Sequence, residues 1–417
     1  MVMDIFGRIF TQINEISGRI PTLSIISGLN AGGAAYASVM TDTVIMIDGS
    51  MMAVTGPVVI KVATGEEVSP DEMGGAQLHA EKSGEAHYRV PDYPTAAQLV
   101  KRYFSYLPQS MFDFPPQAQT WERSGARPDL RAIVTSARKN ARLKRNANWD
   151  VRTFIDAAVD VDTWFEYHES FAPSVVVGFA RVAGVPVSII ANQRSVLGGS
   201  MTAASSSKVT RFLRLANTYH LPVITLVDVP GFIATQAESE GQILSKGAAL
   251  LMMYPNVMVP QISVVIDMAF GGAYCAMGSS TTETERSRFC HHYGFPTGQI
   301  AVVGKEAGPF FTYGFNGGDA VMRNRQQQRY ETEYLNMDMA FAKEFVVPLE
   351  PEDLRKRLLE DVPKLYASYQ NYWRKLAKEL KLVQEKCHYP VSYTHLRAHE
   401  TTSLISYAVF CLKRGGG

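Results

Sequence analysis

The stretch that decides the fold reads Val259-Pro260-Gln261-Ile262-Ser263-Val264-Val265-Ile266-Asp267-Met268-Ala269-Phe270-Gly271-Gly272-Ala273-Tyr274. Its apolar, β-branched run from Ile262 to Ile266 predicts a buried strand. The two glycines that follow end the strand sharply and let the backbone approach a ligand closely. Good helix formers come next, so a strand, a Gly-Gly turn and a helix start follow one another. Such an arrangement aims several free N–H groups at one point and suits an oxyanion.

The same pattern occurs once before, in Pro21-Thr22-Leu23-Ser24-Ile25-Ile26 and the Ala31-Gly32-Gly33-Ala34-Ala35-Tyr36 that follows it. In both copies the proline lies eleven positions before the first glycine, and a serine lies three positions after the proline. An expected helix precedes each copy, at 5–16 and 241–253. Gly-Gly-Ala alone is common in α/β turns, so the matched proline, serine and spacing are what favour duplication over chance. We expect two copies of one α/β unit, each with a pocket of backbone N–H groups.

Composition excludes several classes of protein. The 417 residues are 46% hydrophobic and 19% charged, which indicates a globular chain with room for two domains. The net charge of +1 provides no bulk basic field for nucleic acid. The four cysteines show neither metal-ligand spacing nor a secreted disulfide framework, and no run of 18 apolar residues predicts a membrane span. The first residues lack signal-peptide form, so we expect the cytoplasm or the mitochondrial matrix.

The unequal halves define the expected domains. About 100 residues of strand-rich chain precede the second Gly-Gly but only about 31 precede the first, so we expect the N-terminal unit to be truncated by roughly seventy residues. The expected division is a partial N-terminal domain at 1–110, a linker or insertion at 111–150 and a second domain at 151–390. Residues 391–417 resemble translated adapter read-through and are expected to be a non-native tail.

The rest of the chain alternates between strands and helices, which indicates an α/β fold. Apolar, β-branched runs predict strands at 43–47, 174–180, 185–191 and 223–227. Further patterns predict helices at 93–107, at 205–219, from Pro57 onward, and at 352–383 with a break at Pro363. His79 and His87 could be catalytic, but we favour a surface loop or a helix-capping role. The basic run at 138–145 is expected to be a solvated insertion rather than a phosphate contact.

The chemistry follows from the two turns. A thioester enolate needs donors aimed at its carbonyl oxygen, and backbone N–H groups supply them without side-chain acids. Two such pockets suggest that two carbonyl groups take part in one reaction. A series of motifs then occurs in order: Val176-Val177-Gly178-Phe179-Ala180-Arg181-Val182-Ala183-Gly184, Ala191-Asn192-Gln193, Ser206-Ser207-Lys208-Val209-Thr210-Arg211-Phe212, Asp228-Val229-Pro230-Gly231-Phe232, Gly247-Ala248, Phe270-Gly271-Gly272-Ala273-Tyr274 and Phe295-Pro296-Thr297-Gly298-Gln299-Ile300-Ala301-Val302.

In these motifs the chain resembles the carboxyltransferase (β) subunit of biotin-dependent acyl-CoA carboxylases of the propionyl-CoA carboxylase type. The first half agrees, through Thr55-Gly56-Pro57, Gly74-Gly75-Ala76 and the segment from Ser83 to His87. The resemblance covers roughly residues 1–350 and implies two crotonase-like (ClpP/crotonase ββα-superhelix) domains, the first of them truncated. It also implies a hexamer, a trimer of dimers, with each active site between the N-domain of one protomer and the C-domain of another.

The resemblance further implies a biotin carboxylase or biotin carrier partner that delivers carboxybiotin. The biotin ureido nitrogen then takes the α-proton of a short-chain acyl-CoA, and the enolate attacks CO2. Carried onto this chain, the acyl thioester oxygen is held by Gly32, Gly33 and Ala34. The biotin ureido oxygen is held by Gly272 and Ala273, next to a biotin-side site made of Pro230, Gly231, Phe232, Gly271 and Tyr274. No side-chain base and no metal are required.

The chain departs from the family pattern at several places. Cys275 stands where propionyl-specific members carry an acidic residue, so the choice between acetyl- and propionyl-CoA stays open. The segments from Thr281 to His292 and from Lys305 to Glu333 are also unlike the common pattern.

Three other functions remain open. The first is the carboxyltransferase subunit of a sodium-pumping decarboxylase, which runs the reaction backwards beside a membrane partner. The second is a crotonase-type hydratase, which needs two carboxylates around one water; Glu238 and Glu240 are the candidates, although we favour surface or helix-start roles for them. The third is a non-catalytic assembly subunit.

Overall fold

The computed structural model describes residues 2–119, 127–141, 149–279, 289–335, 337–342 and 346–387, with the side chains of 2–3, 136–141 and 380–387 left aside. The basic run at 138–145, most of the divergent segment from Thr281 and the expected tail at 391–417 therefore lie outside what can be tested. Within the described residues, no helix is both long and apolar enough to cross a membrane.

The second half is built on one eight-stranded sheet in the order β13-β11-β10-β9-β8-β7-β6, with β12 also pairing with β10. Only β6–β7 and β7–β8 are antiparallel. Every residue of β7, β8 and β9 is buried, as the continuous apolar runs predict. The strands are β6 (Phe165–Tyr167), β7 (Val175–Val182), β8 (Val185–Asn192), β9 (Val223–Val229), β10 (Gln261–Phe270), β11 (Cys290–Gly294), β12 (Gln299–Ala301) and β13 (Val347–Pro348).

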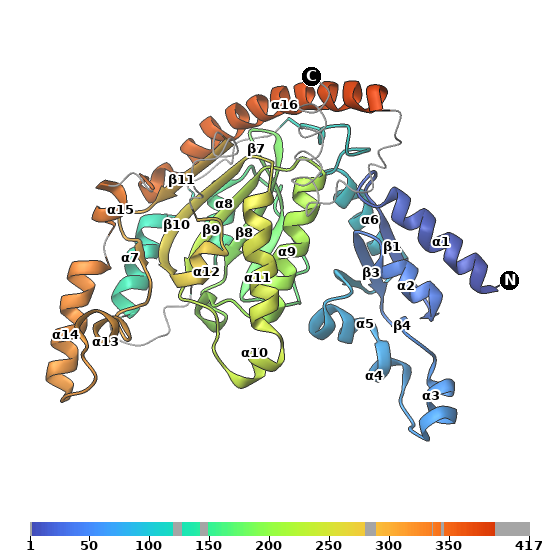
Figure 1. The fold of residues 1–417 in the computed structure, drawn as a ribbon, viewed down its shortest axis with the longest axis horizontal. Helices are drawn as coiled ribbons and strands as arrows, with labels where there is room; N and C mark the ends of the chain where they lie inside the picture. Colours follow the sequence, from blue (N-terminus) through green and yellow to red (C-terminus); the bar gives the residue numbers. More distant parts are fainter. Residues whose placement is uncertain are drawn as a thin grey trace.

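Helices cover this sheet and extend from it (Figure 1). Helix α9 (Ala203–Thr218) packs beside α11 (Ile243–Met253), and it begins with a capping box in which Thr202 and Ser205 satisfy each other's backbone N–H groups. The other helices of this half are α7 (Leu130–Ala141), α8 (Arg152–Ala158), α10 (Gln236–Glu240), α12 (Gly271–Cys275), α13 (Gly308–Tyr313), α14 (Ala320–Tyr334), α15 (Asp338–Ala342) and α16 (Leu354–Cys387).

Helix α16 runs along one side of the molecule from the second half toward the first (Figure 1). The predicted break at Pro363 is wrong, because the helix continues through this proline. Proline removes one backbone hydrogen bond and is unfavourable inside a helix. Leu358, Val362 and Tyr366 are nevertheless buried on both sides of it, so packing of the apolar face offsets the loss.

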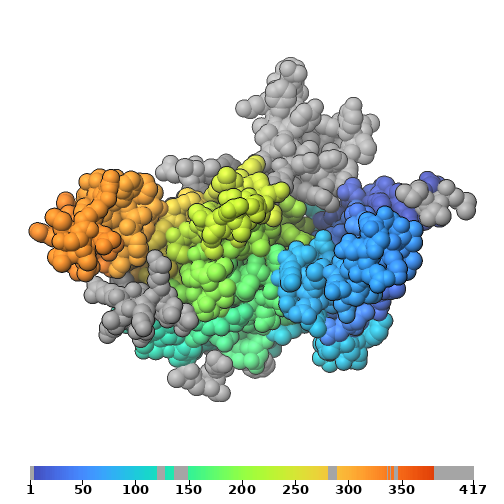
Figure 2. All heavy atoms as spheres, turned by 90° about the horizontal axis from the view of Figure 1, so that it is seen from below, coloured from blue at the N-terminus to red at the C-terminus, as the bar shows by residue number. Residues whose placement is uncertain are grey.

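The first half holds a three-stranded parallel sheet, β1-β3-β5, and a two-stranded one, β2-β4. The strands are β1 (Leu23–Ile26), β2 (Leu29–Ala31), β3 (Thr43–Ile47), β4 (Met51–Ala53) and β5 (Tyr88–Val90). The helices are α1 (Val2–Ile16), α2 (Gly33–Val39), α3 (Pro57–Thr64), α4 (Pro70–Gly74), α5 (Ala76–Leu78), the π-helix η1 (His79–Ser83) and α6 (Tyr93–Phe104). Figure 2 shows this blue half at one end of the molecule and the orange segment that includes α13 and α14 at the other.

The predicted duplication is confirmed by the strand pairing. In the first copy β1 pairs with β3 and β2 with β4, whereas in the second copy the single strand β10 pairs first with β11 and then with β12. Between the two sets of pairs the register shifts by the same two residues in both copies. The partners are Leu23 with Thr43 and Leu29 with Met51 in one copy, and Ile262 with His291 and Met268 with Gln299 in the other.

Candidate functional site

Each copy places a glycine in the left-handed region directly after a strand: Gly32 immediately precedes α2, and Gly271 is the first residue of α12. Gly32 has φ 63° and Gly271 has φ 58°, a backbone conformation that side chains of L-residues disfavour. In both copies the nearest backbone carbonyl belongs to the residue that follows the paired strand, which is β4 in the first copy and β12 in the second. A Cβ on Gly271 would lie 2.9 Å from the carbonyl oxygen of Val302, and one on Gly32 would lie 3.8 Å from that of Val54.

The first turn presents two backbone N–H groups. The N–H of Gly33 and that of Ala34 have no acceptor among the described residues, because the helix makes its first bond only when Tyr36 donates to the Gly32 carbonyl at 3.2 Å. The expectation that Gly32 is itself a donor needs correction. Its N–H donates to the carbonyl of Ala53 at 3.1 Å, so the sheet already uses it, and Gly32 contributes its conformation instead.

The second turn presents the N–H groups of Gly272 and Ala273, which also have no acceptor within the described part of the chain. A Cβ added to Gly272 would meet nothing within 4 Å, so open space lies in front of this residue. The first turn is more closely covered, because a Cβ on Gly33 would come within 2.5 Å of the Phe6 ring of α1. The second turn therefore has donors without partners and room for an oxygen acceptor.

The segment from Pro230 to Phe232 follows β9, the neighbour of β10, so it lies at the same edge of the sheet as the Gly-Gly turn. All three of its residues are half-buried. Met201 holds the segment from the other side: its N–H donates to the Gly231 carbonyl at 3.0 Å, and its carbonyl accepts from Ile233 at 2.9 Å. This geometry forms a fixed wall beside the second turn.

Tyr274 and Cys275 are the last two residues of the short helix α12. Tyr274 is half-buried, and burial raises the pKa of its phenol to about 12, so it remains protonated at neutral pH. Cys275 is exposed with a free thiol. Both residues lie directly beyond the two unpartnered amides, as the sequence places them.

The two candidate histidines hold structure together, and their predicted place in a surface loop is wrong. His79 is 6% exposed, and its Nε2 lies 2.6 Å from the carbonyl oxygen of Met52 in β4. His87 is 3% exposed, and its Nδ1 accepts the Val44 N–H at 3.0 Å. Burial holds the pKa of His87 well below its usual value. Both rings are therefore buried and bonded within the chain.

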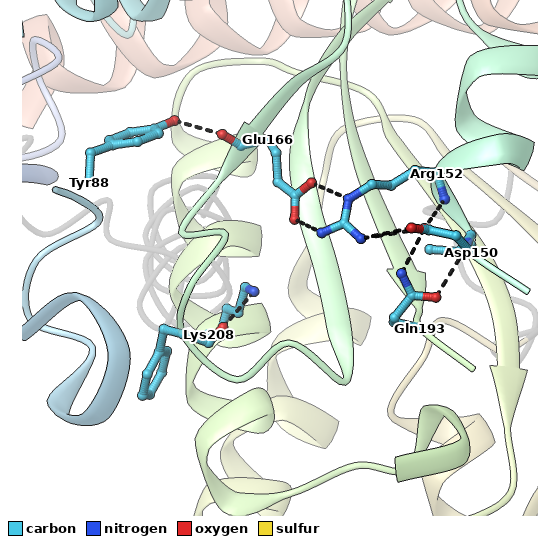
Figure 3. A network of polar contacts seen from close by, with 8 residues as sticks. Tyr88, Asp150, Arg152, Glu166, Gln193 and Lys208 are labelled. Atoms are coloured by element: carbon cyan, nitrogen blue, oxygen red, sulfur yellow. Dashed lines mark hydrogen bonds and ion pairs between the residues drawn. The ribbon is translucent and has the colours of Figure 1, made fainter. Parts of the chain in front are cut away.

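A polar network that includes Glu166 joins the halves (Figure 3). The hydroxyl of Tyr88 donates to the Glu166 carbonyl at 3.1 Å, and the Glu166 carboxylate receives two bonds of 2.7 Å from Arg152. Asp150 accepts from Arg152 and from the side chain of Gln193, the latter at 2.7 Å. Gln193 thus ties the loop after β8 to the residues before α8.

Lys208 is a buried lysine beside this joint. It is 2% exposed, and its Nζ donates to the Phe171 carbonyl at 2.7 Å. Burial lowers its pKa to about 7.

A partly open cavity lies away from both turns. This cavity of about 460 Å³ separates α7, α8 and α16 and is lined by Arg127, Arg131 and Arg355. Arg127 donates to carbonyls at the end of α8, Arg131 pairs with Glu350 and Glu352, and Arg355 pairs with Asp160. These guanidinium groups stabilise helix ends and loops, and the cavity includes none of the predicted site residues.

With this fold and these two turns, the chain belongs to the carboxyl transferase domain family, whose model matches residues 2–375. Among curated proteins it is similar to the propionyl-CoA carboxylase carboxyltransferase subunit of Haloferax mediterranei, with 35% identity over 86% of this chain and 68% of that protein. It is also similar to the biotin-dependent acetyl-/propionyl-coenzyme A carboxylase beta5 subunit of Mycobacterium tuberculosis, with 36% identity over 82% of this chain and 64% of that one. The chain thus spans about two thirds of the length of these relatives.

Solved structures agree with the assignment. The hexameric transcarboxylase 12S, determined with methylmalonyl-coenzyme A and methylmalonic acid bound, matches with a TM-score of 0.80 and 32% identity, covering 88% of this chain and 69% of that one. A single-chain, multi-domain long-chain acyl-CoA carboxylase matches with a TM-score of 0.69 at 24% identity and supports the fold. The expected α/β fold with crotonase-like domains is confirmed.

Proposed function

We propose that this chain is a carboxyltransferase that moves a carboxyl group from carboxybiotin to the α-carbon of a short-chain acyl-CoA. One observation carries the proposal: each of the two turns presents, at the start of a helix, two backbone N–H groups that have no acceptor among the described residues. Donors of this kind stabilise negative charge that develops on a carbonyl oxygen. Membership of the carboxyl transferase family supports the same chemistry.

In this proposal the amides of Gly33 and Ala34 bind the thioester oxygen of the acyl-CoA. As the α-proton leaves, negative charge grows on that oxygen, and fixed amides stabilise it without reorganisation. Removal of one such donor typically costs about 10²–10³ in kcat. In this proposal no side chain acts as the base. Carboxybiotin, when bound, supplies both the carboxyl group and the basic ureido nitrogen.

The amides of Gly272 and Ala273 bind the ureido oxygen of biotin, and the wall from Pro230 to Phe232 limits where the bicyclic ring lies. The open space in front of Gly272 fits an oxygen acceptor of this kind. Cys275, exposed at the end of α12, is proposed to lie near the acyl chain. Comparison of acetyl-CoA with propionyl-CoA as acceptors tests that role.

Partners follow from the same proposal. A biotin carrier subunit must deliver carboxybiotin, and the chain is proposed to assemble as a hexamer, as the transcarboxylase 12S does. Exposed apolar side chains support self-association, because patches of this kind mark contacts between proteins. They lie at related places in the two copies: Val54, Val58, Val59 and Val62 around α3, and Val302, Phe310 and Phe311 around α13.

We do not favour the alternative that this chain is a crotonase-type hydratase. Glu238 accepts the Ala203 N–H at 2.6 Å at the start of α9, and Glu240 accepts from Gln236 at 2.9 Å. Both carboxylates therefore stabilise helices. The family relatives are carboxylase and transcarboxylase subunits, which favours carboxylation over sodium-pumping decarboxylation.

The direct test uses the purified chain with methylmalonyl-CoA and free biotin. Formation of propionyl-CoA that requires biotin is the expected result. No turnover would favour an assembly subunit, and hydration of crotonyl-CoA would favour a hydratase. A requirement for ATP and biotin carboxylase in the forward direction then separates a carboxylase from a sodium-pumping decarboxylase.

A further inference from the structure

A buried group of three charges lies beneath the second turn. Arg194 bridges two carboxylates: its Nη2 donates to Asp228 at 2.8 Å and to Asp267 at 2.6 Å, and its Nε lies 2.8 Å from Asp228. The three residues are 8%, 0% and 4% exposed. The guanidinium also lies over the ring of Trp149, 5.6 Å from its centre. We call Arg194, Asp228 and Asp267 the arginine clamp.

The clamp lies where the ladder between β9 and β10 is irregular. Between Val227 and Val229, the single residue Asp228 faces three residues of β10. A bulge of this kind leaves backbone groups without ladder partners. The side chain of Asp228 takes the place of one missing ladder partner: its Oδ1 accepts the N–H of Met268 at 3.1 Å. The side chain of Asp228 therefore takes part in the backbone pairing just before the second turn.

The clamp connects the two segments to which we assign biotin. Asp228 comes two residues before Pro230, and Asp267 comes four residues before Gly271. Since one guanidinium holds both carboxylates, it fixes the separation between the wall and the turn. A planar guanidinium that binds two carboxylates constrains orientation as well as distance, which apolar packing does not do.

The first copy forms the same turn with no carboxylate at the one clamp position that has a counterpart in this sequence. The position that corresponds to Asp267 is Gly28, where a Cβ would meet nothing within 4 Å. Gly32 and Gly271 nevertheless have φ values of 63° and 58°. The left-handed glycine therefore forms in the first copy without a carboxylate at the position of Asp267, so that carboxylate is not needed for the conformation of the turn itself.

We propose that Arg194, held by Asp228 and Asp267, is a positioning residue for the biotin half of the reaction. This inference rests on the proposed function and deepens it. Arg194 acts through the strand ends, by keeping the wall at 230–232 and the amides of Gly272 and Ala273 at the separation that biotin needs. The acyl half, built from the first copy, does not depend on it.

The test compares three variants of the full chain in transfer from methylmalonyl-CoA to free biotin. Arg194→Met keeps an unbranched apolar stem like that of arginine but loses the guanidinium that bridges the two carboxylates. Arg194→Lys keeps the charge but not the planar bridge. Arg355→Met removes a similarly buried arginine that pairs with Asp160 at 3.1 Å and touches neither turn, so it is the matched control.

We expect Arg194→Met to raise the KM for biotin about tenfold and to lower kcat on the order of 100-fold, as a displaced site does. The KM for methylmalonyl-CoA should change less than about twofold. Arg194→Lys should recover part of the loss, and Arg355→Met should leave both KM values unchanged. If Arg194→Met folds poorly, Asp267→Asn provides a milder change, with the same selective rise in biotin KM expected.

Three results would overturn the inference. An unchanged biotin KM in the folded Arg194 and Asp267 variants, with transfer intact in the wild type, would remove the positioning role and leave the proposed function in place. A wild type that neither binds biotin in calorimetry nor transfers to it would overturn the proposed function as well. Equal increases in both KM values would indicate a general structural role and would also contradict the inference.

Discussion

Gly32 and Gly271 occupy the same left-handed backbone conformation, φ 63° and 58°, at the same place in two copies of one structural unit. Each follows a strand, lies at the start of a helix and faces the carbonyl of the valine that comes after the paired strand, β4 in the first copy and β12 in the second. A glycine is needed there because a Cβ is strained at positive φ. The amides that have no acceptor within the described part of the chain belong to the residues after these glycines, so the glycine sets the backbone conformation and its neighbours are free to bind a ligand.

This division predicts opposite effects for two adjacent substitutions. Gly272→Val should fold normally, since its Cβ meets open space and its φ is not in the left-handed region. It should lower carboxyl transfer by at least about 10²-fold, because the side chain fills the proposed biotin pocket. CoA binding should be spared. Transfer kinetics and calorimetry with CoA check this, and retained turnover would exclude Gly272 from the mechanism.

Gly271→Ala should instead destabilise the fold. The alanine would be held at φ 58°, which costs roughly 1–2 kcal/mol, and its Cβ would lie 2.9 Å from the Val302 carbonyl oxygen. Urea unfolding of wild type, Gly271→Ala and Gly272→Ala measures the difference. Equal stability of the two alanine variants would contradict the conformational role of Gly271.

The contact of Phe6 with Gly33 predicts energetic coupling between α1 and the first turn. Gly33→Ala alone should lower the free energy of unfolding by about 1–3 kcal/mol, because its Cβ would overlap the Phe6 ring at 2.5 Å. In Phe6→Ala the same substitution should cost much less, since the ring is gone. A double-mutant cycle measures the coupling, expected at about 0.5–3 kcal/mol. Additive effects would mean that the ring moves aside freely.

Lys208 predicts a pH dependence of stability. Its pKa is about 7 in the folded chain, against an ordinary value of 10.5. Between these values the unfolded chain binds a proton that the folded chain does not, so stability should rise with pH from about 7 toward 10. The slope is on the order of 1 kcal/mol per pH unit. Below pH 7 both states are protonated, and the burial penalty remains in full.

The comparison variant is Lys208→Met, in which this rise should disappear. The unfolding free energy of Lys208→Met, measured at pH 7, 8 and 9, should change less with pH than that of the wild type. Lys246→Met, a loss of the same charge on α11, should keep the wild-type slope. A wild type and Lys208→Met with parallel curves would show that Lys208 stays protonated over this range.

Local patterns in the sequence were sufficient to predict most of the framework. The predicted strand at 43–47 coincides with β3, and the apolar runs before each Gly-Gly became β1 and β10. These elements are predictable because periodicity and turn chemistry act within a few residues. The duplication was visible for the same reason, since each copy carries its proline, serine and glycines at equal spacing. The proposed division into domains stays a prediction.

Features that depend on pairing between distant segments could not be predicted. The N–H of Gly32 donates to the carbonyl of Ala53 because β2 pairs with β4 in one particular register. His79 and His87 are buried because other elements cover them, which the polar, glycine-rich composition of their segment does not reveal. The arginine clamp joins three residues with no common motif, so no sequence pattern indicates it.

The exposed apolar groups around α13 and α3 predict how the chain self-associates. Phe310 is 53% exposed and Phe311 is 70% exposed, and α13 lies in the orange segment that projects from the molecule (Figure 2). Because exposed rings of this size disfavour a monomer in water, the double variant Phe310→Ser and Phe311→Ser should shift the sedimentation profile toward smaller species. The double variant Val58→Ser and Val62→Ser, in the patch around α3, should also shift the profile toward smaller species.

The control is Leu244→Ser, which changes an exposed leucine on α11 and should leave the profile unchanged. If both double variants sediment like the wild type at equal concentration, neither patch is a subunit contact, and the shared active site that we expect from the family would need another interface.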